Sequence, residues 1–329
     1  MPYFQRGYKY YYSTLTQDEM VCYNAILSGL LAFQRKITIP KFCSNHIFQI
    51  YLFILIDNPY LFYVENLGIA SEYYIEDKTE LSVTYLYEPA QVIDMITKAD
   101  AKHSNFVASL ANHDAMNKAL AVHDYFLDNI QYDNASNLLS FTAIGPLLHG
   151  AGVCAGISYA AKIMFDQCGI DSVIAQGELF DLKTNYTEPH AWNLIKLNNS
   201  FFHFDITSDI GLSDHVKRYD YVGLSTEEIK KDHLIVTGLI DCPVSNNYYL
   251  HMGLTLKKKS DFERIINKTL CSGETNICFK IIADAEVEKI QDQLEIIIQN
   301  QLNVTRSNYS RFYIEPNATQ KVFCVRFEK

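Results

Sequence analysis

The chain has 329 residues, of which 48% are hydrophobic, 13% aromatic and 20% charged, and its formal net charge is −10. This length and composition suit a folded globular protein with a sizeable core and exclude extended disorder. The acidic balance argues against nonspecific nucleic-acid binding, because phosphate contacts need clustered lysines and arginines. The single basic run, Lys257-Lys258-Lys259, precedes an expected helix and is interpreted as a solvated linker.

The cysteines show neither zinc-ligand pairs nor the density of a disulfide scaffold, so we expect no metal site and a reducing compartment. Met1 to Tyr12 lacks the apolar core of a signal peptide. Phe48 to Ile56 is the most apolar run, but it is shorter than the roughly 18 residues that span a bilayer. We therefore expect a cytoplasmic protein without a membrane span, and secretion of a trimmed chain is the alternative.

Residues 1–104 are predicted to form a mostly helical N-terminal extension. Thr16-Gln17-Asp18-Glu19 is a capping box that predicts a helix from there to about Phe33. A second helix should end near Ile56 and another should begin near Pro89, with strand character over Leu81 to Tyr87. Since this region carries no catalytic constellation, we interpret it as an extension that packs on the core or shapes a substrate site.

A helix is predicted from about Asp114 to Asn129, with His123 on its apolar face. We interpret His123 as a hydrogen-bonded core histidine. Gln131 and Tyr132 follow this helix and could cap it or cover the core.

Cys154 follows a glycine-bearing loop and opens an apolar run with helical spacing that ends at Gly169. Its thiol is therefore placed at a helix N-terminus, where unpaired amides and the helix dipole favour the thiolate. The Cys154 backbone N–H could also face a developing oxyanion. A small buried hydrophobe is the ordinary role of a single cysteine, so this position gains weight only with its partners.

His190 to Leu197 and Phe201 to Asp205 are predicted to be paired strands. If Asn198-Asn199 is a two-residue turn, His190 lies opposite Thr207 and Asp205 is its diagonal neighbour on the same face. A three-residue loop without a bulge would send Asp205 to the other face. Taken singly, the histidine fits a core position and the aspartate fits a turn, so only the ordered set of Cys, His and Asp is specific.

These residues carry a family resemblance. Gly152-Val153-Cys154-Ala155-Gly156, then His190-Ala191-Trp192-Asn193, then Phe204-Asp205-Ile206-Thr207 resemble the bacterial transglutaminase-like superfamily over about residues 105–255. The Tyr219 to Ser225 and Lys231 to His233 stretches also look similar to bacterial members. The chain departs from the family pattern at Ile206 and Ser208, where many members carry proline and tryptophan.

The resemblance implies a papain-like core and a catalytic triad of Cys154, His190 and Asp205. In papain-like folds a polar side chain upstream of the nucleophile often completes the oxyanion hole. By that resemblance Gln131 or Tyr132 is a candidate for this role.

The predicted fold class is α+β. A helix bearing Cys154 packs on an antiparallel sheet bearing His190 and Asp205 over residues 105–255, and a small α/β unit follows over residues 256–329. In that unit we predict a helix over Asp261 to Leu270, a strand from Ile277, a helix through Val287 and Leu302, and strands near Phe312 and over Lys321 to Phe327.

The expected function is a thiol-dependent amide hydrolase, a transglutaminase-like cysteine peptidase that acts through a thioester. A protein-glutamine transglutaminase or deamidase would use the same triad and is the alternative. A non-catalytic protein- or carbohydrate-binding module on this fold is the alternative of another class. We expect a protein or peptide substrate and no cofactor, and the sequence leaves the oligomeric state open.

Overall fold

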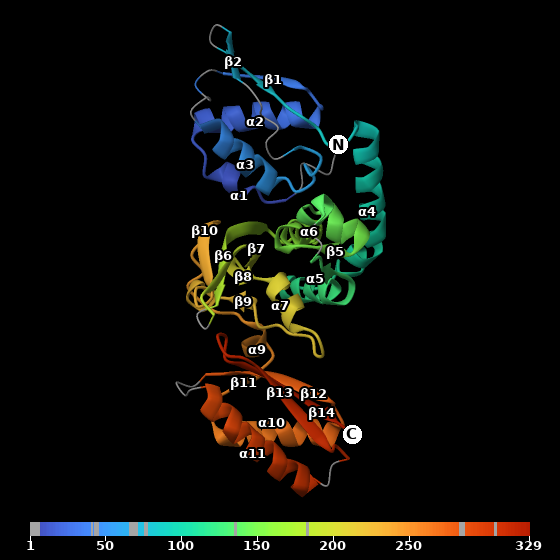
Figure 1. Ribbon diagram of the computed structural model, residues 1–329, viewed down its shortest axis with the longest axis vertical. Coiled ribbons are helices and arrows are strands. Elements are labelled where there is room, and N and C mark those ends of the chain that lie inside the picture. The colour runs from blue at the N-terminus through green and yellow to red at the C-terminus, as the bar shows by residue number, and fades with distance from the viewer. Residues whose placement is uncertain are drawn as a thin grey trace.

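The computed structural model describes residues 7–40, 42, 46–65, 72–75, 78–134, 137–181, 184–282, 287–305 and 308–329. Its elements form three groups that follow one another along the longest axis of the molecule (Figure 1). Helices and mainly antiparallel sheets occur together, which confirms the predicted α+β class. Within the described ranges, none of the helices is both long and apolar enough to cross a membrane.

The N-terminal group is mainly helical, as predicted, but it also holds an antiparallel sheet with the strand order β1-β3-β2. Thr16 and Glu19 form the expected capping box at the start of α2. The elements are α1 (Tyr10–Ser13), α2 (Gln17–Leu31), β1 (Lys36–Pro40), α3 (Ile47–Asp57), β2 (Glu72–Ile75), β3 (Lys78–Ser82) and α4 (Pro89–Ser109).

Hydrogen bonds join the N-terminal group to the middle group. The Tyr11 hydroxyl donates to the carbonyl oxygen of Ile174 at 2.6 Å, and Lys162 Nζ donates to the carbonyl oxygen of Tyr8 at 3.0 Å. Helix α4 runs alongside both groups in Figure 1, so the predicted boundary at residue 104 falls inside a helix. The division into domains stays a prediction.

The middle group is built around an antiparallel sheet with the strand order β10-β6-β7-β8-β9. Helix α6 packs on this sheet and shares a hydrophobic core with it and with α5. The elements are α5 (Ala115–Asn129), β4 (Gln131–Tyr132), the 3₁₀ helix η3 (Leu138–Phe141), the π-helix η4 (Gly145–His149), β5 (Ala151–Gly152), α6 (Cys154–Gln167), β6 (Ser172–Asp181), β7 (Tyr186–Leu197), β8 (Ser200–Phe204), α7 (Ile206–Leu212), β9 (Val222–Leu224), α8 (Thr226–Ile229) and β10 (His233–Thr237).

The β7–β8 hairpin has the predicted two-residue turn. Asn198 and Asn199 both have positive φ values, 48° and 69°, and Leu197 pairs with Ser200. The ladder stops at the pair Asn193 and Phe204, because the next residue, Asp205, becomes the N-cap of α7. The expected pairing of His190 with Thr207 is therefore wrong, since Thr207 lies inside that helix.

The C-terminal group forms the small α/β unit expected from the sequence. Its sheet has the strand order β11-β12-β14-β13, and α10 and α11 pack on it around a separate hydrophobic cluster. The elements are α9 (Tyr248–His251), β11 (Thr255–Leu256), α10 (Lys259–Ser272), β12 (Asn276–Ile281), α11 (Val287–Thr305), β13 (Arg311–Asn317) and β14 (Val322–Glu328).

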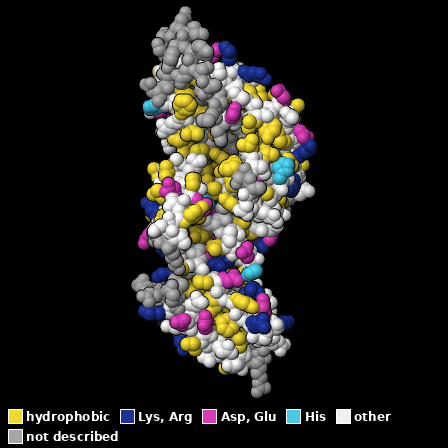
Figure 2. Space-filling model, viewed as in Figure 1, with side chains coloured by type: hydrophobic (Ala, Val, Ile, Leu, Met, Phe, Trp, Pro, Cys, Tyr) yellow, Lys and Arg dark blue, Asp and Glu magenta, His cyan; other side chains and the backbone are white. Residues whose placement is uncertain are grey.

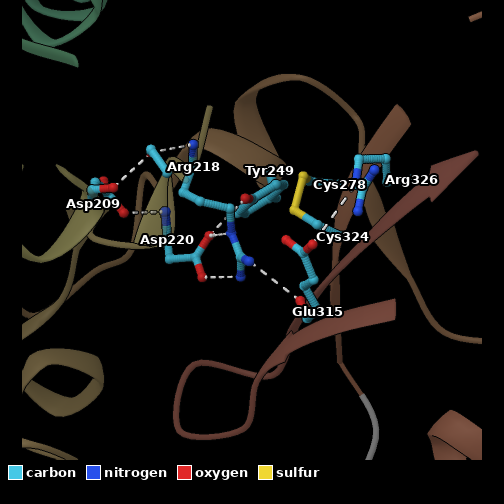
Figure 3. The surroundings of a disulfide bond; sticks show 9 residues. Asp209, Arg218, Asp220, Tyr249, Cys278, Glu315, Cys324 and Arg326 are labelled. Carbon is cyan, nitrogen blue, oxygen red and sulfur yellow. Dashed lines mark hydrogen bonds and ion pairs between the residues drawn. A yellow bond between two sulfur atoms is a disulfide. The ribbon is translucent and has the colours of Figure 1, made fainter. Parts of the chain in front are cut away.

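A disulfide joins Cys278 and Cys324, which face each other across β12 and β14. Cys22 is disulfide-bonded as well. The expectation of a reducing compartment did not anticipate these bonds. Close to the disulfide, Arg218 forms an ion pair with Asp220 and donates to the carbonyl oxygen of Glu315 at 3.2 Å, which ties the middle group to the C-terminal group (Figure 3).

On the face drawn in Figure 2, hydrophobic side chains form patches over the middle of the molecule. Lysine, arginine and acidic side chains are interspersed around them. The described part of this face carries no continuous basic stripe, and the absence of nucleic-acid binding stays a prediction.

Candidate active site

Cys154 is the first residue of α6, as the sequence predicted. Its thiol is half-buried, and Sγ lies 4.0 Å from the carbonyl oxygen of Pro189. A backbone hydrogen bond holds the residue before the helix in place: the Val153 N–H donates to the carbonyl oxygen of Ser140 at 3.0 Å. The thiol therefore lies at the positive end of the helix dipole, beside the strand that carries His190.

Gly156 explains why the Cys154 motif needs a glycine in the first turn of α6. A Cβ at this position would lie 2.1 Å from the carbonyl oxygen of Ser140 and 2.9 Å from that of Thr142. The backbone of the η3 segment can approach the helix start only because residue 156 has no side chain.

Strand β7 is fastened to α6 by two buried hydrogen bonds. Ser158 Oγ donates to the carbonyl oxygen of Ala191 at 2.9 Å, and Asn193 Nδ2 donates to the carbonyl oxygen of Ser158 at 3.0 Å. These bonds lie directly after His190 in the strand and one turn after Cys154 in the helix. They therefore hold the imidazole next to the thiol.

His190 and Asp205 are both buried, with His190 Nε2 2.8 Å from Asp205 Oδ2. Burial by itself would lower the pKa of His190, but the Asp205 carboxylate raises it to about 10, with a smaller contribution from Cys154. Burial opposes the ionised form of Asp205, yet His190 and His233 hold the pKa of this carboxyl well below its usual range. Nε2 faces the carboxylate, which leaves Nδ1 as the ring nitrogen available to Cys154.

The structure thus brings together the three residues that the sequence predicted as a triad. It also adds groups that sequence reasoning did not assign. Ser208 donates to Asp205 Oδ2 through its hydroxyl and to Oδ1 through its backbone N–H, the latter at 3.1 Å. Ser208 is one of the two positions where the chain departs from the family pattern.

His233 is the second unassigned group. Its Nε2 lies 3.1 Å from Asp205 Oδ2, and its Nδ1 lies 2.6 Å from Asp232 Oδ1. The sequence pointed to the Lys231-Asp232-His233 stretch only as a resemblance, because the contact depends on how β10 is placed beside β6.

The two oxyanion candidates differ in their surroundings. They form β4, in which Tyr132 pairs with Gly152, two residues before Cys154. Burial raises the pKa of the Tyr132 hydroxyl, and Cys154, Glu188 and Tyr186 raise it further, so the ring lies near the thiol. Successive strand residues point to opposite faces, which directs the Gln131 side chain away from the side of Tyr132. The oxyanion role stays a prediction, and Tyr132 is the better placed of the two.

His123 is a buried core histidine, as predicted. Its Nε2 lies 3.0 Å from Asp209 Oδ2, and its ring stacks on Tyr219. It does not contact the Cys154 site.

Among the described residues, His190, Asp205 and His233 could place three ligand atoms within 4.8 Å of one another around a metal ion. Each of the facing nitrogen and oxygen atoms already has a hydrogen-bond partner within this group. We therefore interpret the cluster as a hydrogen-bond network.

Sequence comparison agrees with the motifs. Residues 104–206 match the profile of the Transglutaminase-like superfamily, a segment that contains Cys154, His190 and Asp205. A search of curated proteins finds no significant match.

Three solved structures are similar to part of the chain. A protein from Cytophaga hutchinsonii that is proposed to be a cysteine protease is 16% identical, with a TM-score of 0.26 over 42% of this chain and 61% of that one. A TGase is 18% identical, with a TM-score of 0.29 over 42% of this chain and 43% of that one. A proposed protease from Parabacteroides distasonis is 12% identical, with a TM-score of 0.25 over 43% of this chain and 35% of that one.

This chain therefore spans less than two thirds of each of these proteins. The sequence match and the motifs that carry it place residues 104–206 of this chain in the transglutaminase-like superfamily.

Proposed function

We propose that the chain is a thiol-dependent amide hydrolase, a cysteine peptidase of transglutaminase-like type. Cys154 is the nucleophile, His190 the acid and base, and Asp205 the group that orients His190. The observation that carries this proposal is the position of the His190 ring, with Asp205 at one nitrogen and the half-buried Cys154 thiol close by.

The reaction proceeds in two halves. The Cys154 thiolate attacks the amide carbon, a C–S bond forms, and the carbonyl electrons move onto oxygen. When the intermediate collapses, the C–N bond breaks and the leaving amine takes a proton from the His190 imidazolium. Water then attacks the thioester, His190 accepts a proton from this water, and the acid leaves as the thiol is restored.

Asp205 supports the charge that His190 carries. Its carboxylate is buried and held from two sides by Ser208, so its orientation is set before the substrate arrives. The thiolate and imidazolium that start the reaction are therefore an ion pair backed by a fixed negative charge.

The second candidate function is a protein-glutamine transglutaminase or deamidase. The first half of the reaction is the same for a glutamine side chain, and an incoming amine replaces water in the transferase. We favour hydrolysis because the bacterial relatives that the chain resembles are usually regarded as peptidase-like.

A single assay distinguishes these outcomes. The protein is incubated with a glutamine-containing peptide library and a fluorescent primary amine, and mass spectrometry identifies the products. Peptide-bond cleavage supports the hydrolase, attachment of the amine supports the transglutaminase, and a mass gain of one unit at glutamine supports the deamidase. If wild type and Cys154→Ala give identical product spectra, the proposal of a thiol enzyme is wrong.

The disulfides bear on the compartment in which this enzyme acts. The Cys278–Cys324 bond and the disulfide-bonded Cys22 are typical of chains that fold in an oxidising environment. They favour the secreted alternative over the cytoplasmic location expected from the sequence.

A further inference from the structure

The Asp205 carboxylate is shared between two histidines. His190 on β7 reaches Oδ2 at 2.8 Å, and His233 on β10 reaches the same oxygen at 3.1 Å. All three side chains are buried, and the two imidazole rings lie 5.3 Å apart. The carboxylate that orients His190 is therefore also a hydrogen-bond partner of a second imidazole nitrogen, that of His233.

His233 faces a carboxylate at each of its nitrogens, Asp205 at Nε2 and Asp232 at Nδ1. A neutral imidazole has one N–H and can donate to only one of them, whereas an imidazolium donates to both. Burial opposes the charge, but the two hydrogen-bonded carboxylates raise the pKa of His233. The two facing carboxylates therefore favour the protonated form of the buried His233.

Two features hold the His233 side chain in place. The Tyr221 hydroxyl donates to Asp232 Oδ2 at 2.6 Å and fixes the second carboxylate. Strand β10 approaches β6 closely at Gly177, where a Cβ would lie 1.7 Å from the carbonyl oxygen of Leu234. The glycine thus permits the strand position from which His233 reaches Asp205.

We propose that His233 is a positioning residue for the triad: as a standing imidazolium it holds the Asp205 carboxylate and takes up part of its negative charge. His190 then releases its proton to the leaving amine more readily than it would beside an unshared carboxylate. This inference rests on the proposed function and specifies how its acid–base residue is tuned.

Several titratable groups surround the two histidines and the Asp205 carboxylate. Asp205 and Asp232 contact His233 directly, and Tyr221 contacts Asp232. The further groups that influence them are Cys154 beside His190, Asp209 beside Asp205, and the neutral His203 on β8, whose pKa burial lowers to about 3.

The test compares His233→Gln with His123→Gln in the full chain. Glutamine can still donate to Asp205 but carries no charge. His123 is a matched control, since it is also a buried imidazole bonded to a carboxylate and does not touch Asp205. Histidine-labelled protein is titrated by NMR, which reports the His190 midpoint without any turnover, and the pH dependence of Cys154 alkylation by iodoacetamide is recorded beside it.

We expect His233→Gln to raise the His190 midpoint by about one pH unit, because the full negative charge of Asp205 then acts on His190. The pH profile of Cys154 alkylation should move in the same direction, to higher pH. His123→Gln should move both by less, because His123 bonds to Asp209 and not to Asp205. An unmoved or lowered His190 midpoint in folded His233→Gln overturns the inference.

A second variant covers a failure of His233→Gln to fold. Asp232→Asn removes one of the two carboxylates that stabilise the His233 cation. It should also raise the His190 midpoint, by a smaller amount than His233→Gln does. An unchanged or lowered midpoint in this variant overturns the inference too. If the midpoints move as expected but Cys154→Ala and wild type show the same activity, the proposed function fails while the coupling between His233 and His190 stands.

Discussion

The backbone N–H of Ser208 lies 3.1 Å from Oδ1 of Asp205, so the residue that contacts His190 is also the N-cap of α7. One carboxylate oxygen starts a helix and the other faces the imidazole. The capping hydrogen bond therefore fixes the orientation of the Asp205 carboxylate. In a strand without such a cap, the side chain could take other rotamers.

Asp205→Asn should separate these two roles. Asparagine is as good an N-cap as aspartate, so the unfolding free energy attributable to the cap should change little, whereas Asp205→Ala should lose about 1 kcal/mol more. Both variants lose the negative charge, and amidase activity should fall by roughly 10³-fold or more. Thermal unfolding and kcat/KM on a cleaved peptide measure the two effects. Equal activity in wild type and Asp205→Asn would remove Asp205 from the mechanism.

Gly156→Ala should disturb the site without touching a reacting group. The new Cβ would meet the Ser140 carbonyl oxygen at 2.1 Å, so η3 or α6 must shift, at a cost of about 1–3 kcal/mol of stability. Gly211→Ala in α7 is the matched control, because nothing lies within 4 Å of its added Cβ. The control should be neutral or stabilising by roughly 0.5–1 kcal/mol. Urea unfolding of both variants checks this, and equal stability would contradict the close approach at Gly156.

The raised pKa values of His190 and His233 predict how stability changes with pH. The folded protein binds these protons more tightly than the unfolded chain, whose histidines titrate near pH 6.5. This contribution is complete below about pH 6.5 and is lost as the pH rises toward the His190 value of about 10. Unfolding free energies measured between pH 6 and 10 should fall for wild type and fall less steeply for His190→Ala. Parallel curves would contradict an imidazolium at His190 in the folded state.

Reduction should weaken the C-terminal group. The Cys278–Cys324 bond closes a loop with a sequence separation of 46, and its removal in Cys278→Ser should cost about 2–4 kcal/mol. Cys271→Ser is the control, because Cys271 is a free, exposed cysteine. Hydrogen exchange in β12 and β14 with and without reductant reports the effect. Unchanged exchange would show that the bond does not support this sheet.

Local signals in the sequence carried most of the correct predictions. Two examples are the capping box of Thr16 and Glu19 and the turn at Asn198 and Asn199. Both act through neighbouring backbone groups, so the structure that each forms depends little on the rest of the fold. The start of α6 at Cys154 was predictable for the same reason.

Contacts between distant segments were not predictable in this way. His233 meets Asp205 only because β10 pairs with β6 on the edge of the sheet, and no local pattern reports that pairing. The partner of a cysteine is likewise unreadable from spacing, which is why the Cys278–Cys324 bond was missed. The strand expected through Asp205 ends one residue early, at Phe204, because Asp205 is the N-cap of α7 and its carboxylate accepts from the Ser208 N–H.

The most direct test of the proposed mechanism is iodoacetamide alkylation of Cys154 as a function of pH, read by peptide mass spectrometry in wild type, His190→Ala and Asp205→Ala. Cys271 serves as the internal reference for an ordinary exposed thiol. We expect Cys154 of wild type to react selectively below pH 7, and this reactivity to be lost in His190→Ala and reduced in Asp205→Ala. If Cys154 reacts no faster than Cys271 at any pH, or if His190→Ala leaves its reactivity unchanged, the thiolate–imidazolium pair does not exist and the proposed mechanism is wrong.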